Sequence, residues 1–317
     1  MKKDFLSIAD LTQNEVFELL ALADTLRTQK ELKPLAGKTI ATIFQKPSLR
    51  TRVSFEVGII QLGGHAIFLT DEGVGLGTRE SAADVAHVLS RFNDGIVARV
   101  FDHQLLLDMA KHATIPVINA LSDLSHPCQI LADLYTIRQY KKLRDYVKIA
   151  YVGDGNNIVN SWLELSTIIP LHLTLAIPYG YEPDKTIYQK ALEARVSKIE
   201  IIRDPKSAVN KADVVYTDTW TSMGQEHERT KRIYDFWEYQ VNTSLIRQAK
   251  EDVIVMHCLP AHRGEEITDD ALDGKQSVVN DQAENRLHVQ KAIMAKLIGN
   301  FTAMGENKKS DAPFQII

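Results

Sequence analysis

The chain has 317 residues, of which 44% are hydrophobic and 25% charged, and its 37 basic and 41 acidic side chains give a formal net charge of −4. This apolar content suffices for sizeable cores and excludes intrinsic disorder, while the lack of a basic cluster argues against nucleic-acid binding. No apolar run approaches the ~18 residues of a membrane span, and two cysteines are too few for a disulfide framework, so we expect a cytoplasmic protein without a membrane partner.

The first half of the chain alternates short apolar runs with stretches of helical period. The predicted elements are, in order, a strand at 39–44, a helix through 53–60, a strand at 66–69, a helix at 81–91, strands at 95–100 and 115–119 separated by a helix, and a helix at 127–140. Strands that alternate with helices of this length are typical of a parallel sheet covered on both faces.

The second half repeats this pattern after a polar stretch at 138–145. We expect strands at 148–152, 173–177, 214–217 and 253–257, a helix that follows the first of them through Trp162, and a last helix from about 283 to 298. The sequence therefore predicts an α/β protein with two doubly wound parallel-sheet domains of similar size, at 1–146 and 147–317.

Ligands of such sheets bind at the carboxyl ends of the strands, so the residues just after each strand are informative. After the strand at 39–44 the chain reads Lys46-Pro47-Ser48-Leu49-Arg50-Thr51-Arg52. Ser48 can cap a helix whose first turn then carries two arginines, although helix starts usually prefer acidic residues. This favours a phosphate site over a solvated, capped helix.

Three later loops also carry polar side chains. Residues 125–129, Ser-His-Pro-Cys-Gln, place His126 and Gln129 on either side of a helix-starting proline; a simple cap with a buried Cys128 is the alternative. Residues 153–157, Gly-Asp-Gly-Asn-Asn, lack the third glycine of a dinucleotide fingerprint because residue 158 is isoleucine, which leaves Asn157 as a polar substrate contact.

Two loops near the end of the second sheet complete the set. Asp218 follows a predicted strand and precedes Ser222 by four residues, an arrangement suited to an ammonium group, and Cys258 follows a neighbouring strand. A turn aspartate and a structural core cysteine are the alternatives. The ten histidines show no metal-ligand spacing, so no metal and no cofactor is implied.

At these loops the sequence resembles the aspartate/ornithine carbamoyltransferase family. The motifs S-x-R-T-R, H-P-C-Q, D-x-x-x-S-M-G and H-C-L-P stand in the family's order across nearly the whole chain. The first two are shared across the family, and the last two indicate ornithine. The resemblance implies transfer of a carbamoyl group from carbamoyl phosphate to the δ-amine of L-ornithine, a step of arginine metabolism, and a final helix that packs back on the first domain.

The resemblance also implies residue roles. The residues that would bind carbamoyl phosphate are Ser48, Leu49, Arg50, Thr51, Arg99, His126, Gln129, Cys258, Leu259 and Arg286. The residues that would bind ornithine are Asn157, Asp218, Ser222 and Met223. Arg99, His126 and Cys258 would be the catalytic groups, with Cys258 and Leu259 between the two substrates.

Members of the family are usually homotrimers or multiples of trimers, which the resemblance extends to this chain. The sequence departs from the pattern at two positions. Leu49 replaces a threonine, which keeps a backbone N–H contact and loses a hydroxyl. Gly75 stands where many relatives carry a polar residue that reaches the neighbouring subunit's site, leaving Thr78 or Arg79 as substitutes.

Two other functions stay open at the level of sequence. One is a carbamoyltransferase for another amine, such as putrescine or an N-acylated ornithine; Asp218 with the S-M-G triplet favours a free amino acid. The other is an NAD-dependent dehydrogenase, which Ile158 and Pro178 disfavour because the glycine fingerprint and the ribose-binding carboxylate are both missing.

Overall fold

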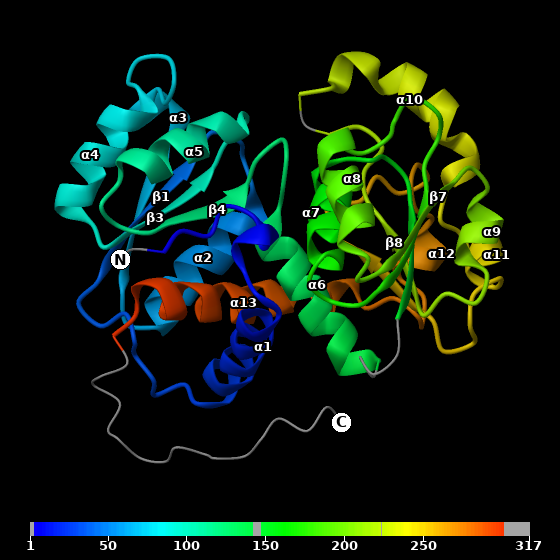
Figure 1. The fold of residues 1–317 in the computed structure, drawn as a ribbon, viewed down its shortest axis with the longest axis horizontal. Coiled ribbons are helices and arrows are strands. Elements are labelled where there is room, and N and C mark those ends of the chain that lie inside the picture. Colours follow the sequence, from blue (N-terminus) through cyan, green and yellow to red (C-terminus); the bar gives the residue numbers. More distant parts are fainter. Residues whose placement is uncertain (1–2, 142–146, 223, 301–317) are drawn as a thin grey trace. The chain divides into compact units, whose positions relative to one another are not determined.

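Two parallel β-sheets, each in its own compact unit, organise the chain in the computed structural model (Figure 1). The structure describes residues 3–141, 147–222 and 224–300. Unit 1 comprises Met1–Ala132 with Arg286–Ile317, and unit 2 comprises Asp133–Asn285. This confirms the predicted fold class, including a final helix whose larger part belongs to the first unit. The predicted domain boundary at residue 146 lies outside the described residues and stays a prediction.

Unit 1 is built on a four-stranded sheet in the order β2-β1-β3-β4. Its strands are β1 (Thr39–Phe44), β2 (His65–Thr70), β3 (Gly95–Arg99) and β4 (Val117–Leu121). Its helical segments are η1 (Ile8–Asp10), α1 (Gln13–Thr28), α2 (Leu49–Gln61), α3 (Asp71–Val74), α4 (Ala82–Phe92), α5 (His103–His112) and the start of α6 (Pro127–Tyr140), with most of α13 (Val279–Ile298).

Unit 2 is built on a five-stranded sheet in the order β7-β6-β5-β8-β9. Its strands are β5 (Lys148–Val152), β6 (His172–Ala176), β7 (Lys198–Ile202), β8 (Val214–Thr217) and β9 (Ile254–His257). Its helical segments are α7 (Asn157–Ser166), α8 (Lys185–Ala194), α9 (Pro205–Val209), η2 (Glu226–Glu228), α10 (Arg229–Phe236), η3 (Trp237–Tyr239), α11 (Thr243–Ile246) and α12 (Asp269–Leu272).

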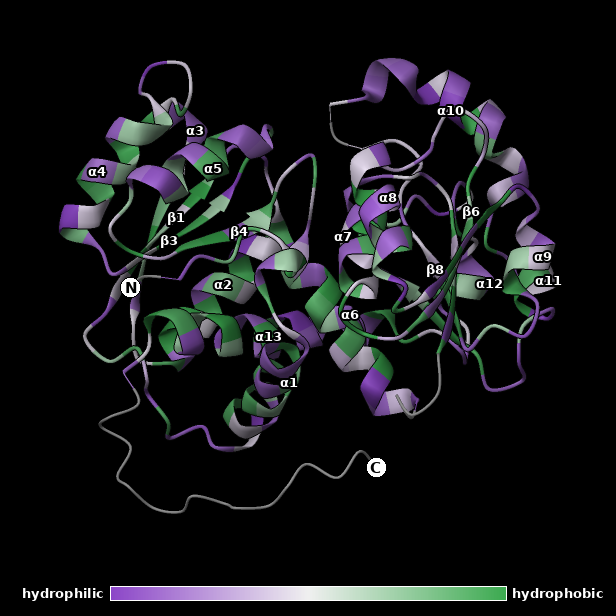
Figure 2. Cartoon of the chain, in the orientation of Figure 1, coloured by the Kyte–Doolittle hydropathy of each residue, from purple (hydrophilic) through white to green (hydrophobic). Residues whose placement is uncertain are grey.

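Apolar strands form the two cores. In β1 all residues after Thr39 are buried, and β3 is buried throughout, as expected for strands covered on both faces. The hydropathy colouring shows these strands as hydrophobic and the exposed helix α10 as largely hydrophilic (Figure 2). No helix among the described residues is long and apolar enough to span a bilayer.

Strand order fixes where ligands have room in each unit. The chain leaves β1 for β2 on one side and returns to β3 on the other, so the strand order reverses between β1 and β3. In unit 2 the same reversal occurs between β5 and β8. At such reversals the adjacent loops diverge and open a crevice beyond the carboxyl ends of the strands. The motif loops predicted from sequence follow β1, β4, β5, β8 and β9, and Arg99 ends β3.

Candidate functional site

The amino end of α2 follows β1 directly. Ser48 is its N-cap, and the Ser48 hydroxyl accepts a hydrogen bond from the backbone N–H of Thr51 at 3.3 Å, as the sequence predicts. The first helical turn therefore presents backbone N–H groups and the positive end of the helix dipole, with Arg50 half-buried in it. Leu49 is 73% exposed and contributes no polar side chain. This geometry suits an anion.

Two buried arginines meet at the Thr51 hydroxyl. Thr51 Oγ1 accepts hydrogen bonds from Arg99 Nη1 at 3.2 Å and from Arg286 Nη2 at 2.6 Å, and all three residues are buried. Arg99 comes from the end of β3 and Arg286 from α13, 235 positions from Thr51, so residues far apart in the chain share one acceptor. Two guanidinium groups held together away from solvent attract a polyanion strongly.

His126 lies buried near the same arginines at the start of α6. Burial, with the positive charges of Arg286 and Arg99, holds the pKa of His126 well below its usual 6.5, so the imidazole is neutral at neutral pH. Gln129, one turn further on, is 1% exposed. Cys128 between them donates to Asn119 O at 3.3 Å, and burial raises its pKa to about 12. Cys128 is therefore a protonated core residue, whereas the neutral imidazole and the amide suit a carbonyl group.

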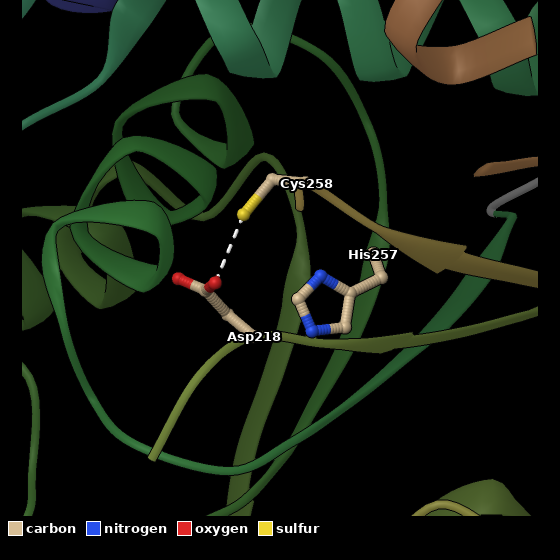
Figure 3. Close-up of side chains that lie close together, drawn as sticks. All are labelled: Asp218, His257 and Cys258. Carbon is tan, nitrogen blue, oxygen red and sulfur yellow. Dashed lines mark hydrogen bonds between the residues drawn. The ribbon is translucent and has the colours of Figure 1, made fainter. Parts of the chain in front are cut away.

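In unit 2, Asp218 lies at the end of β8 with its carboxylate held by neighbours. It accepts hydrogen bonds from Cys258 Sγ at 2.9 Å, from Asn156 Nδ2 at 2.8 Å and from the Thr219 backbone at 2.8 Å. Figure 3 shows the Cys258 sulfur aimed at this carboxylate, with the His257 ring to one side. The structure thus brings together two of the residues predicted from separate loops, and Asn156 joins them.

The turn after β9 has an unusual backbone. Leu259 has φ = 57°, in the left-handed region that costs a branched residue energy, and its N–H donates to His257 Nδ1 at 2.9 Å. The other ring nitrogen of His257 lies 3.1 Å from Glu266 Oε1, and both side chains are fully buried. Because Nδ1 accepts, Nε2 carries the proton and donates to Glu266. The pair fixes the conformation that presents Cys258 and Leu259.

A metal ion could be held, by distance alone, by Asp218, His257 and Cys258, because their potential ligand atoms lie within 4.8 Å of one another. Both nitrogens of His257 are already engaged, one by the Leu259 N–H and the other by Glu266. A metal would have to break one of these buried contacts. The geometry therefore favours a structural role for His257.

The other residues predicted for the second substrate lie on two loops. Asn157 is the first residue of α7, immediately after the N-cap Asn156, and Ser222 is half-buried in the loop after β8. Met223 lies outside the described residues. The contribution of these three residues to a binding site stays a prediction.

Gly75, the departure noted in the sequence, ends α3 with φ = 65°. A Cβ there would lie 2.7 Å from Arg79 Cβ, so a side chain would strain both the backbone and its neighbour. The Thr78 hydroxyl donates a hydrogen bond to Gly75 O at 3.0 Å, and the Arg79 guanidinium donates one to Gly73 O. Both candidate substitutes are thus engaged within their own loop in this chain.

Sequence reasoning missed the buried pair Asp154 and Arg232. Their side chains are 8% and 7% exposed and lie 3.0 Å apart, and Arg232 also donates to Trp220 O at 2.9 Å. Burial raises the pKa of Asp154 to about 6 despite the opposing pull of Arg232. Arg232 lies on α10, far along the chain from Asp154, so only the fold reveals that it connects the loop after β5 with the loop after β8.

Two family models match the chain. The model described as aspartate/ornithine carbamoyltransferase, carbamoyl-P binding domain, matches residues 3–139, and the model of the Asp/Orn binding domain matches residues 145–297. An ornithine carbamoyltransferase of Chlorobaculum tepidum is 50% identical over 94% of this chain and 90% of its own length. One of Syntrophus aciditrophicus is 52% identical, over 94% and 100%. The solved ornithine carbamoyltransferase of Pyrococcus furiosus superimposes with a TM-score of 0.89 at 48% identity, over 94% and 97%.

Proposed function

The chain belongs to the aspartate/ornithine carbamoyltransferase family, and from that membership we propose how its residues share the work of the reaction. The reaction transfers the carbamoyl group of carbamoyl phosphate to ornithine, giving citrulline and phosphate. Carbamoyl phosphate is already activated, so the proposal needs no cofactor and no metal. What the protein must supply is positioning and charge.

Unit 1 binds carbamoyl phosphate in this proposal. The observation that carries it is the pair of buried arginines, Arg99 and Arg286, that meet at Thr51 Oγ1 beside the amino end of α2. The phosphate accepts hydrogen bonds from the backbone N–H groups of Ser48, Leu49 and Arg50, from the Thr51 hydroxyl, and from the guanidinium groups of Arg50, Arg99 and Arg286. Anion binding at a helix start, reinforced by arginine, is a common arrangement for phosphate.

His126 and Gln129 hold the carbonyl side of the same substrate. The pKa of His126 lies well below 6.5, so its imidazole is neutral and can donate from one nitrogen without adding a charge that titrates near neutral pH. Together with Arg99 it stabilises the oxyanion that forms when the carbonyl carbon is attacked. Removal of one donor of this kind typically costs about 2.7–4 kcal/mol of transition-state stabilisation.

Unit 2 binds ornithine. In this proposal Asp218 binds the α-ammonium group of ornithine. The amino-acid end of the substrate is also bound by Asn157, Ser222 and Met223. Asn156 and Cys258 hold the Asp218 carboxylate in place through bonds of 2.8 and 2.9 Å. Cys258 and Leu259 are the residues nearest the transferred group in this proposal. The low exposure of Asp218, 7%, strengthens its attraction for a cation.

The chemistry proceeds by direct attack. The neutral δ-amine of ornithine attacks the carbonyl carbon and a tetrahedral oxyanion forms. The bond from carbon to the phosphate oxygen then breaks as the amine passes its proton to the departing phosphate. A free amine of the lysine type has a pKa near ~10.4, so only about one molecule in a thousand is neutral at pH 7.4. The arginines of the site disfavour the ammonium form and raise that fraction. No covalent Cys258 intermediate is required.

The experiment is a citrulline assay with a panel of amines. Purified protein with carbamoyl phosphate should form citrulline and phosphate in equal amounts from L-ornithine, and should use putrescine and N-acetylornithine at least a hundredfold less efficiently as judged by kcat/KM. A preference for putrescine would contradict the assignment of Asp218 to an α-ammonium group, and a preference for N-acetylornithine would do the same.

We further propose that the chain assembles as a homotrimer or a multiple of trimers, and that it acts in the cytoplasm. The support for this assembly is the membership of the family.

A further inference from the structure

A cluster of positive side chains lines a cavity in unit 1, at the carboxyl ends of α1 and α2 and beside α13. Its volume is about 250 Å3, several times the ~30 Å3 share of one water molecule. The cationic residues Arg27, Lys30, Lys33 and Lys291 line it together with His288, and none of its described lining residues carries a carboxylate. The cavity shares no residue with the two substrate sites proposed above.

Lys291 is the buried member of this cluster. It is 4% exposed, and its Nζ donates to Leu26 O and to Gln61 Oε1, both at 3.0 Å. Lys33 Nζ donates to the backbone oxygen of the same Gln61 at 2.6 Å. All three acceptors are formally neutral. Burial, followed by the positive charges of Lys33 and Lys30, lowers the pKa of Lys291.

Helix ends account for only part of this arrangement. Leu26 lies in the last turn of α1 and Gln61 is the last residue of α2, and lysines commonly bind such terminal carbonyls. A helix carboxyl end carries about −0.5 of an elementary charge, so the two ends supply about one negative charge. Lys30, Lys33 and Lys291 supply three positive charges. These three lysines alone therefore leave an excess of about two positive charges at the cavity, to which Arg27 adds.

The lysine stems are held by close backbone contacts. A Cβ at Gly63, where φ is 86°, would lie 3.0 Å from Lys33 Cβ, and a Cβ at Gly58 would lie 3.2 Å from Lys291 Cγ. The end of α2 thus packs directly against both side chains. Because the stems of Lys33 and Lys291 are already positioned, a ligand loses less free energy in ordering these two side chains.

We propose that this cavity binds a phosphate-class oxyanion, held by Lys30, Lys33 and Lys291. A phosphoryl group carries about −1.5 to −2 at pH 7, which matches the excess positive charge, and its oxygens accept from three ammonium groups at once. A free phosphate ion and the phosphate of a small monoester present the same chemistry. The site depends on the charges around the cavity and stands apart from the residue roles proposed for catalysis.

Equilibrium dialysis with radiolabelled inorganic phosphate tests the proposal on the full-length protein at constant ionic strength. A bisubstrate analogue that joins a phosphonate to ornithine blocks the substrate site. With the analogue saturating, the wild type should still bind about one phosphate per chain. Lys30→Gln with Lys33→Gln should weaken that binding at least tenfold; both positions are exposed at the cavity rim, so the fold should tolerate the change.

The matched control is the double substitution Lys111→Gln with Lys190→Gln, at two exposed lysines outside the cavity. It removes the same amount of charge and should leave phosphate binding unchanged. Competition with glycerol 3-phosphate identifies the source of the ligand. If glycerol 3-phosphate displaces the label at a lower concentration than unlabelled phosphate does, the ligand is a monoester. If it needs a higher concentration, the ligand is the free ion. The proposal is overturned if no phosphate binds beside the analogue, if the control pair weakens binding equally, or if chloride at equal ionic strength displaces the phosphate.

Discussion

Thr51 offers a test of the phosphate site that removes no charge. Its hydroxyl is the shared acceptor for Arg99 and Arg286, so Thr51→Val keeps the shape and leaves both guanidinium groups without that contact. Hydrogen bonds to charged groups contribute about 1.5–3 kcal/mol each. We expect the Kd of carbamoyl phosphate, measured by calorimetry without ornithine, to rise roughly tenfold or more.

Thr42→Val is the control for that experiment. Thr42 is also a fully buried threonine of unit 1, but its hydroxyl donates to a backbone oxygen, Ile67 O, at 3.3 Å. This variant should lower the free energy of unfolding slightly and leave the Kd within a factor of two. Equal Kd values for both variants would remove Thr51 from the proposed site.

The ionisation of His126 and of ornithine predicts the pH profile. Because the pKa of His126 lies well below 6.5, this residue does not titrate between pH 6.5 and 9, and the substrate amine dominates the profile. At saturating carbamoyl phosphate, kcat/KM for ornithine should rise with pH above neutrality, with a slope approaching one logarithmic unit per pH unit. A flat profile over this range would contradict attack by the neutral δ-amine.

The link between α10 and the loop after β5 can be tested at the level of elements. Arg232→Gln leaves the buried Asp154 without its 3.0 Å partner, a change that typically costs about 3–5 kcal/mol. Since the pKa of Asp154 is about 6 and rises further without Arg232, the folded variant takes up a proton as the pH falls. The loss of unfolding free energy should therefore be larger at pH 8 than at pH 5.5, as measured by urea denaturation.

Arg229 on the same helix is the matched control. Its ion pair with Glu265 involves an arginine side chain that is 55% exposed, and exposed pairs contribute about 1 kcal/mol or less. Arg229→Gln should change the unfolding free energy little at either pH. Equal losses for Arg232→Gln at pH 8 and pH 5.5 would show that Asp154 is not the group that Arg232 stabilises.

The elements predicted from sequence differ in accuracy for a physical reason. The strands at 39–44, 148–152 and 214–217 have the predicted bounds, because continuous apolar runs mark strands buried on both faces. The edge strand β7 was missed, since Lys198 and Glu200 make its run polar. The last helix begins at Val279 instead of about 283, where polar residues obscure the helical period.

In the candidate site, too, some features could be predicted from the sequence and others could not. The motif loops were found because parallel strands place their following residues at one edge of the sheet. Asn156, Arg232 and Glu266 were missed because each acts through a contact that the linear sequence does not display, such as the Asn156 bond to Asp218 across 62 positions. The pairing of Thr51 with Arg286 is equally invisible without the fold, although both residues were named from the resemblance.

At the scale of the whole molecule, the assembly can be tested directly. Equilibrium sedimentation of the purified chain, whose mass is 35.6 kDa, should give three chains or a multiple of three. A fully active species that sediments as a single chain at micromolar concentration would contradict the proposed assembly.

The central claim is that unit 1 binds carbamoyl phosphate and unit 2 binds ornithine, and calorimetric binding of carbamoyl phosphate in the absence of ornithine tests it most directly. Arg50→Ala should weaken this binding at least tenfold, because it removes a charge from the amino end of α2. Asp218→Asn keeps the shape of its side chain and should leave the binding within a factor of two while raising the KM for ornithine. Loss of carbamoyl phosphate binding in Asp218→Asn, with normal binding in Arg50→Ala, would contradict the account even if the enzyme makes citrulline.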